Sequence, residues 1–191
     1  MCIRDRYLRD GVVDLAIMGE NLIIEKGEDI HKLERLGFSK CRISIADPKE
    51  TTYNGVEDLT GKRIATSYPN TVKKYLKKLN IEADLHIING SVEIAPNIGL
   101  SDAICDIVSS GSTLFKNNLK EVEVLFESQA ILVGSKLLSD TKQKILETLL
   151  FRIRAVNAGK NSSYIIMNVP NVAIDTISKI LPVLKLSLIH I

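Results

Sequence analysis

The sequence has little cysteine and little histidine, and this scarcity excludes several kinds of chemistry. The cysteines are Cys2, Cys41 and Cys105. They show neither a CxxC spacing nor a histidine nearby, so neither a zinc site nor a disulfide framework is expected. Cys105 falls in an apolar segment, where a free cysteine usually behaves as a small hydrophobic residue. The histidines are His31, His86 and His190. None has an evident partner, so none is a candidate for catalysis.

Long apolar runs and an excess of one charge are also missing. No apolar run approaches the roughly 20 residues that span a bilayer, and no signal sequence opens the chain. The 25 basic and 23 acidic residues give a net charge of +2, which offers no electrostatic footprint for nucleic acid or an anionic membrane. We therefore expect a cytoplasmic protein with reduced thiols that binds neither nucleic acid nor a membrane.

Short apolar segments alternate with amphipathic segments along most of the chain. The predicted strands are residues 11–17, 42–46, 63–67, 84–89, 103–108, 119–127 and 130–134. The predicted helices are residues 71–79 and 140–158, with a helix or helical turn at 91–100. Four lysines of the first helix are expected to form a solvated face. This order of elements predicts an α/β architecture with parallel strand pairing.

The most informative stretch is a run of small residues that follows an apolar strand. It reads Asn89-Gly-Ser-Val-Glu93 and, after an apolar turn, Asp102-Ala-Ile-Cys-Asp-Ile-Val-Ser-Ser-Gly-Ser-Thr113. Successive backbone N–H groups of such a loop can converge on one phosphate, and its hydroxyls can donate as well. The carboxylates can take sugar hydroxyls or a metal. Taken alone, such a loop is more often a plain turn that caps the next helix.

As a whole, this string closely resembles the ATP phosphoribosyltransferase family, whose members open histidine biosynthesis. The resemblance extends from about residue 7 to residue 185 and includes four further motifs. They are Gly11-Val-Val-Asp-Leu-Ala-Ile-Met-Gly-Glu-Asn21, Leu36-Gly-Phe-Ser-Lys-Cys-Arg42, Gly61-Lys-Arg-Ile-Ala-Thr-Ser-Tyr-Pro-Asn70 and Glu121-Val-Glu-Val-Leu-Phe-Glu-Ser128.

The resemblance implies a bilobal fold like that of type II periplasmic binding proteins, with ligands in the cleft. The expected division is 7–46 and 121–160 for the first catalytic lobe, 47–120 for the second, and 161–185 for the start of a C-terminal ferredoxin-like regulatory domain. A predicted strand at 163–169 and a helix at 172–181 indicate that start. Residues 1–6 and 186–191 fit neither their neighbours nor the family, and are set aside as non-native ends. The family's N-terminal strand and glycine-rich turn are missing before Gly11, so we expect an incomplete first lobe that is marginally stable or associates.

The resemblance implies which residues bind the sugar substrate, phosphoribosyl pyrophosphate. Those implied to bind phosphoribosyl pyrophosphate, through its 5-phosphate, are Ser109, Ser110, Gly111, Ser112 and Thr113. The expected catalytic residues are Glu93, which suits the sugar or diphosphate, and Asp106, which suits a ribose hydroxyl or a Mg²⁺-bound water. Asp102 is expected to be only a cap or turn residue.

On the nucleotide side, the implied ATP-binding residues are Gly19, Glu20, Arg42, Arg63 and Tyr68. Arg42 and Arg63 are candidate phosphate clamps, because a guanidinium binds phosphate bidentately. Each can equally be an ordinary surface arginine, and Tyr68 can equally be a buried structural residue. No residue is assigned directly to a metal.

The implied activity is transfer of a phosphoribosyl group from phosphoribosyl pyrophosphate to N1 of the adenine of ATP, with release of pyrophosphate and with Mg²⁺ as cofactor. No covalent enzyme nucleophile is needed, so positioning and charge neutralisation carry the catalysis. Beside the two substrates, the implied partners are histidine, as feedback inhibitor of the complete protein, and further copies in a homo-oligomer. The alternative is a non-catalytic small-anion binding module of the solute-binding type.

Overall fold

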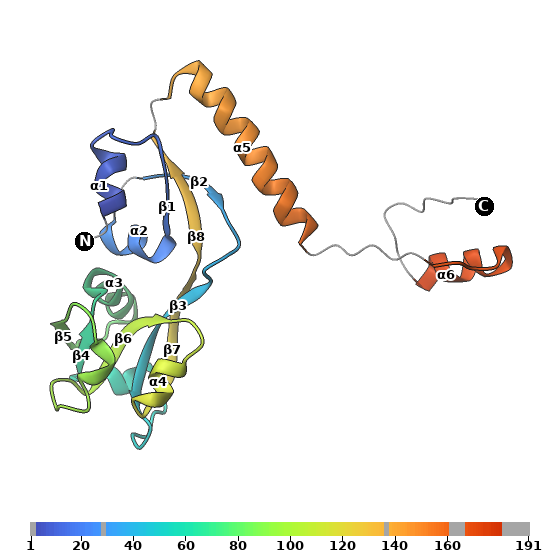
Figure 1. The fold of residues 1–191 in the computed structure, drawn as a ribbon. Helices are drawn as coiled ribbons and strands as arrows, with labels where there is room; N and C mark the ends of the chain where they lie inside the picture. The colour runs from blue at the N-terminus through green and yellow to red at the C-terminus, as the bar shows by residue number, and fades with distance from the viewer. Residues whose placement is uncertain (1–2, 28–29, 136–137, 161–166, 181–191) are drawn as a thin grey trace. The chain divides into compact units, whose positions relative to one another are not determined.

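The computed structural model describes residues 3–27, 30–135, 138–160 and 167–180 (Figure 1). The chain divides into two compact units, residues 1–157 and 158–191. All the described strands lie in the first unit, where they form a five-stranded and a three-stranded sheet. The α/β class expected from the sequence is therefore confirmed.

The larger sheet has the strand order β5-β4-β6-β3-β7. Its strands are β3 (Cys41–Pro48), β4 (Arg63–Thr66), β5 (Asp84–Ile87), β6 (Ala103–Val108) and β7 (Leu119–Ser128). Strand β4 pairs in parallel with β5 and β6, as expected. The expectation of parallel pairing is wrong for β3, which pairs antiparallel with β6 and β7. The reason is geometric: the chain enters this sheet along β3 and leaves it along β7, so the two strands run in opposite directions.

Both faces of the larger sheet are covered by short helices. On one face, α3 (Pro69–Leu79) buries Val72 and Leu76 against Ile43, Ile45 and Ile64. This helix and its apolar stripe agree with the prediction from spacing. On the other face, η2 (Val92–Ile94) and α4 (Ser112–Lys116) contribute Val92 and Leu114 to a second cluster with Ile104 and Val108. Residues 56–59 form a further short helix, η1 (Val56–Leu59).

The smaller sheet has the order β1-β8-β2, and both pairings are antiparallel. It consists of β1 (Leu15–Gly19), β2 (His31–Arg35) and β8 (Ala130–Gly134), and it packs with α1 (Ile3–Arg9), α2 (Glu20–Lys26) and α5 (Asp140–Gly159). Strand β1 begins later than the predicted 11–17, because α1 ends at Arg9 and a turn precedes Leu15. Residues 3–6, set aside from the sequence as part of a non-native end, belong to α1, and Leu8 of that helix is buried.

The boundary between the two sheets differs from the expected lobe boundary. Residues 41–46 and 121–128 were expected in the first lobe, but strands β3 and β7 pair within the five-stranded sheet. Figure 1 shows both strands running side by side toward the smaller sheet. Gln129 alone separates β7 from β8, and the sequence predicts two strands there without showing that they belong to different sheets.

The second unit is described only in part. The predicted strand at 163–169 lies mostly outside the described residues, and residues 167–169 form no strand. The predicted helix at 172–181 corresponds to η3 (Asn171–Ala173) followed by α6 (Ile174–Ile180). The ferredoxin-like domain therefore stays a prediction. Across the described helices, none combines the length and the apolar content needed to cross a membrane.

Candidate functional site

A pocket of about 150 Å³ lies where β6 ends and the small-residue loop begins. Its polar lining consists of Glu93, Asp106, Ser109, Ser110, Gly111 and Thr113. Glu93 comes from η2 and Asp106 from the end of β6, beside the end of the parallel strand β4. The structure thus brings both predicted catalytic carboxylates and most of the predicted phosphate loop to one place. In α/β sheets the carboxyl ends of parallel strands are the usual position for ligands.

The loop is shaped by its glycine. Gly111 has a φ of +78° and directly precedes α4, and no atom lies within 4 Å of the position that a Cβ would take. A side chain there is disfavoured by backbone conformation rather than by lack of space. The Ser110 and Ser112 hydroxyls lie 3.0 Å apart, and buried Leu114 holds α4 to the sheet. Ser109, Ser110, Ser112 and Thr113 are exposed, so their hydroxyls and the loop amides are accessible to an anion.

Asp106 has a raised pKa in this pocket. Its Oδ1 accepts a hydrogen bond from Ser67 Oγ at 3.2 Å. Burial raises the pKa of Asp106, and the charge of Glu93 adds to this, while hydrogen bonds from the Ile107 backbone and Ser67 act in the opposite direction. A cation or a hydroxyl-rich ligand bound here would relieve the repulsion between the two carboxylates.

The donor set of this pocket fits a magnesium ion that is shared with a substrate. Within the described ranges, no cluster of three or more His, Cys, Asp and Glu side chains could hold a metal by itself. Glu93 and Asp106 nevertheless supply two carboxylates in one pocket. Mg²⁺ typically takes one or two carboxylates and completes its shell with water and substrate phosphates.

A second pocket, of about 360 Å³, adjoins the first through Ser109. It is lined by Glu20, Arg35, Lys40, Cys41, Arg42, Ser109, Glu127, Ser128 and Gln129. Three basic side chains therefore face it from β2, β3 and the segment between them. Glu20 is 6% exposed, and both of its carboxylate oxygens accept hydrogen bonds from Arg35, at 2.9 and 3.0 Å. Gly19 ends β1 directly before Glu20, and a Cβ at Gly19 would lie 2.3 Å from Asn21 Oδ1.

Arg42 is held in place beside the loop. Its Nε and Nη2 each donate to an oxygen of the Glu121 carboxylate, and its Nη1 donates to the backbone oxygen of Ser109 at 3.1 Å. Ser44 Oγ also donates to Glu121, at 2.6 Å. The hydrogen bonds from Arg42 are the main cause that lowers the pKa of Glu121. Arg42 therefore anchors the loop and also lines the second pocket.

Arg63 lies at the other end of the sheet. It begins β4, whereas the small-residue loop follows the end of the parallel strand β6. Its Nη2 donates to Asp102 Oδ1 at 2.7 Å, and its Nε and backbone N donate to Oδ2 of the same carboxylate. These hydrogen bonds lower the pKa of Asp102 to about 2. The structure therefore does not bring Arg63 to the pocket, and Asp102 is its partner rather than a cap.

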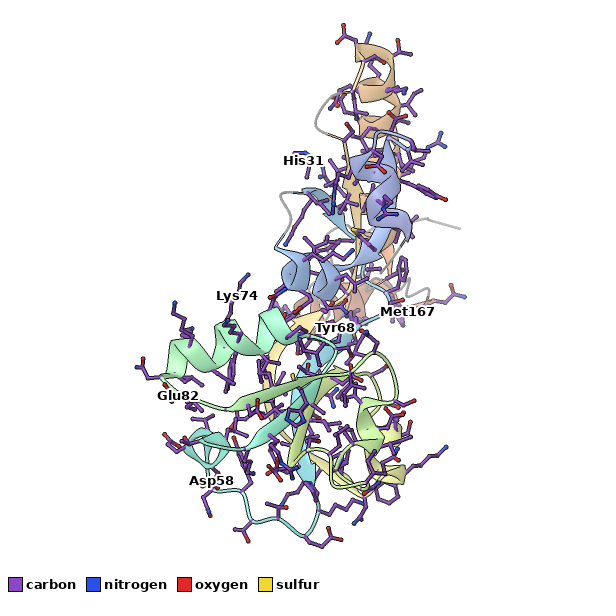
Figure 2. The ribbon with its side chains drawn as sticks, turned by 90° about the vertical axis from the view of Figure 1, so that its left-hand side faces the viewer. His31, Asp58, Tyr68, Lys74, Glu82 and Met167 are labelled. Atoms are coloured by element: carbon purple, nitrogen blue, oxygen red, sulfur yellow. The ribbon has the colours of Figure 1, made fainter. Side chains whose placement is uncertain are left out.

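Tyr68 is a buried residue between the two sheets. It is 8% exposed, and its hydroxyl accepts a hydrogen bond from Asn21 Nδ2 at 2.8 Å. Figure 2 shows it where the part of the chain that carries α2 meets the larger sheet. Of the two alternatives from the sequence, its burial favours the structural one.

Several residues around the pockets were missed from the sequence. Arg35 belongs to β2, whose sequence His-Lys-Leu-Glu-Arg is too polar to be recognised as a strand. Lys40 lies in a motif that was noted, two residues before Arg42, but was not singled out. No local sequence pattern points to Ser67, Asn21 or Ser128. Their hydrogen bonds join segments that are far apart in the sequence.

Comparison with known protein families finds one that covers most of the chain. The model of a family described as ATP phosphoribosyltransferase matches residues 5–155. The chain is 52% identical over 175 residues to an ATP phosphoribosyltransferase of Bacteroides thetaiotaomicron and 54% identical over 179 residues to one of Cytophaga hutchinsonii. These alignments cover 92% and 94% of this chain but 62% and 63% of the relatives. The chain thus spans less than two thirds of the length of these relatives.

Solved structures support the same fold. The ATP phosphoribosyl transferase (HisG:HisZ) complex from Thermotoga maritima has a chain that matches with a TM-score of 0.67 and 30% identity, over 79% of this chain and 73% of that one. The substrate binding protein of an amino acid ABC transporter matches with a TM-score of 0.60 and 17% identity, over 84% of this chain and 73% of that one. The second likeness bears on the fold alone, and it confirms the expected resemblance to periplasmic binding proteins.

Proposed function

Because this chain belongs to the ATP phosphoribosyltransferase family, we propose that it carries the phosphoribosyl pyrophosphate site and part of the ATP site of an enzyme that joins these two substrates and releases pyrophosphate. The observation that carries the proposal is the convergence of Glu93, Asp106 and the small-residue loop on one pocket. This reaction is the first step of histidine biosynthesis.

The small-residue loop is proposed to hold the 5-phosphate of the sugar. A pocket of about 150 Å³ suits a phosphate with part of a ribose, since pockets for whole drug-sized ligands span about 300–1,000 Å³. The Ser109, Ser110, Ser112 and Thr113 hydroxyls and the loop amides are the donors. The fixed conformation at Gly111 keeps them in place before the ligand arrives, which lowers the cost of binding.

The second pocket is proposed to receive the nucleotide. Its volume of about 360 Å³ and the basic side chains of Arg35, Lys40 and Arg42 suit a phosphorylated ligand. Because the two pockets share Ser109, a nucleotide in the second lies next to a sugar in the first. Such proximity is the main requirement of a reaction that has no covalent enzyme intermediate.

The chain's own groups have separate tasks in this mechanism. Glu93 and Asp106 accept hydrogen bonds from ribose hydroxyls and so orient the sugar carbon toward the adenine N1. Their negative charge also favours the positive charge that develops on the sugar as the diphosphate leaves. Glu93 and Asp106 are also the residues that would hold Mg²⁺ if it binds, and the ion would then supply charge neutralisation for the leaving diphosphate.

The partners and the location of the complete protein are part of the proposal. One solved relative is a HisG:HisZ complex, which supports assembly into an oligomer. Histidine is proposed as the feedback inhibitor of the complete protein, and the cytoplasm as its location.

Isothermal titration of phosphoribosyl pyrophosphate with Mg²⁺ into this chain tests the proposal. We expect saturable binding to the wild type and its loss in Asp106→Ala and Gly111→Trp. The matched controls are Asp84→Ala, an exposed aspartate on β5, and Gly61→Trp, a turn glycine with a φ of +73° and open space around it. Both controls should bind normally. Absence of binding to the folded wild type, or equal loss in the controls, would overturn the assignment.

A non-catalytic anion-binding module is the second candidate, because both pockets suit small anions and pockets of this kind can bind without catalysing a reaction. The two candidates differ in product. An enzyme releases pyrophosphate when both substrates are present, whereas a binding module only closes around its ligand. A coupled pyrophosphate assay, run on this chain and on a full-length relative, separates them.

A further inference from the structure

Two consecutive residues at the end of β4 make hydrogen bonds on opposite faces of the larger sheet. Ser67 Oγ donates to Asp106 Oδ1 at 3.2 Å, in the pocket lined by Ile104 and Val108. Tyr68 belongs to the core cluster on the other face, with Val72 of α3. Both residues follow β4, Ser67 at a bend and Tyr68 as the N-cap residue of α3, so the chain turns between them and their side chains lie on different faces.

On the side of Tyr68, a buried polar network leads to the second pocket. Asn21 Nδ2 donates to the Tyr68 hydroxyl at 2.8 Å, and the Asn21 backbone N donates to Ser128 Oγ at 3.0 Å. Ser128 Oγ in turn donates to Asn21 Oδ1 at 3.1 Å. Asn21 and Ser128 are 5% and 4% exposed, so neither side chain can exchange these bonds for water without opening the structure. Ser128 and Glu20, the residue before Asn21, line the second pocket.

On the side of Ser67, the Asp106 carboxylate has few other restraints. In the part of the chain that the structure describes, Ser67 is the one side chain that donates a hydrogen bond to it. Glu93 repels it from η2. Across the sheet, Ser44 lies opposite Asp106 on β3 but donates to Glu121, which is paired with Arg42. The orientation of Asp106 within the pocket therefore depends on the Ser67 hydroxyl together with the hydrogen bond from the Ile107 backbone.

We propose that Ser67 and Tyr68 act together as positioning residues that set the two pockets relative to each other. Ser67 orients Asp106 in the first pocket, and Tyr68, through Asn21 and Ser128, fixes the Glu20 edge of the second. One peptide bond separates the two anchors, so their spacing along the chain is fixed, while each side chain serves one pocket. The assignment of the first pocket to the sugar and of the second to the nucleotide rests on the function proposed above, but the positioning itself does not.

Carboxyl and side-chain amide NMR signals of this chain, without ligand, test the positioning. Ser67→Ala should displace the ¹³C signal of the Asp106 carboxyl group, and Ser67→Thr, which retains a hydroxyl, should restore it. Tyr68→Phe should displace the Asn21 side-chain amide signals. The matched controls are Ser101→Ala, whose buried hydroxyl has no hydrogen-bond partner among the described residues, and Tyr53→Phe, whose hydroxyl donates to Glu123 instead. An unmoved Asp106 signal in Ser67→Ala, or an Asn21 signal that moves equally in Tyr53→Phe, would overturn the proposal.

Ligand titrations then test the division of tasks. Ser67→Ala removes a hydrogen bond to a charged group, so it should lower the affinity for phosphoribosyl pyrophosphate with Mg²⁺ about tenfold and leave ATP affinity nearly unchanged. Tyr68→Phe removes a hydrogen bond to a neutral amide, so it should lower ATP affinity by a smaller factor and leave the affinity for phosphoribosyl pyrophosphate nearly unchanged. Equal losses for both ligands in either variant would contradict separate tasks. If the chain binds neither ligand, the proposed function fails for this chain, while the NMR signals still decide the positioning.

Discussion

Arg42 and Arg63 look alike in the sequence, because each begins an apolar strand and each resembles a phosphate clamp. Arg42 donates to Glu121 and to the backbone of Ser109, so it supports the loop. Arg63 donates to Asp102 at the other end of its sheet. The sequence could not separate them, since the difference depends on which end of the sheet each strand start occupies.

The Arg63–Asp102 pair should make stability depend on pH in the acid range. The pKa of Asp102 is lowered to about 2 in the folded state. A depressed pKa contributes stability that is fully present above the unfolded value, near 4, and is lost as pH falls through the folded value. Asp102→Asn should therefore lower the urea midpoint at pH 6, and the difference from wild type should shrink between about pH 4 and pH 2. Because both side chains are about 40% exposed, the difference should also shrink in high salt. A difference that is constant with pH would contradict this account.

At the scale of elements, α3 is capped by another helix. Its N-cap residue, Tyr68, makes no side-chain cap. Instead, the Glu25 carboxylate of α2 accepts hydrogen bonds from the backbone N–H groups of Asn70 and Thr71, at 2.9 and 2.8 Å. A helix N-terminus leaves such groups unsatisfied and favours a negative charge near them. Glu25 therefore links α2, which packs on the smaller sheet, to α3, which packs on the larger one. It also provides hydrogen-bond acceptors for the free N–H groups at the start of α3.

Removing this cap should destabilise the protein by about 1 kcal/mol, the usual cost of losing an N-cap side chain. The variant is Glu25→Ala, measured by chemical denaturation. Glu57→Ala, an exposed acid in the first turn of η1, serves as control and should have a small effect. Equal effects of the two substitutions would show that the cap contributes nothing.

Helix α5 carries one buried and one exposed apolar side chain whose contributions to stability can be compared. Leu146 is 3% exposed and packs with Leu36, Ala130 and Leu132, whereas Phe151 is 73% exposed. Leu146→Ala should cost about 2–5 kcal/mol, because it leaves a cavity in a packed cluster. Phe151→Ala should change the free energy of unfolding by less than about 0.5 kcal/mol. Thermal denaturation of both variants would reveal the difference, and a larger effect at Phe151 would show that its ring is covered in solution.

The elements that could be predicted from the sequence are those with a local signal. Strand β6 matches its prediction from Ala103 to Val108 because an apolar run is bounded by an acid and a serine. The residues of the first pocket were found for the same reason, since the loop and Asp106 are neighbours in sequence. Strand β2 and helix α2 were missed, because one is polar and the other is a seven-residue helix directly after a strand. The second pocket was only partly foreseen, since its residues come from segments up to about 100 positions apart.

For the whole molecule, exposed apolar side chains predict self-association. Val12 and Ile17, before and within the edge strand β1, are 67% and 44% exposed. Exposed apolar side chains favour contact with another chain. We expect the sedimentation coefficient of this chain to rise with concentration, and Ile17→Lys to reduce that rise. His31→Lys, on the opposite edge strand β2, is the control. A monomer at all concentrations would show that the edge is protected.

The connection between β7 of the larger sheet and β8 of the smaller sheet must keep its length of one residue. Gln129 is the single residue between β7 and β8. Its side chain accepts a hydrogen bond from the Gly37 backbone, and Leu36 N and Ala130 N donate to Ala130 O and Phe38 O across the same junction. Side chains alternate along a strand, so one residue inserted at Gln129 would exchange the two faces of β8, both of which are buried in separate clusters. Insertions and deletions should therefore be confined to the turns at the outer ends of the sheets, where they leave this register unchanged.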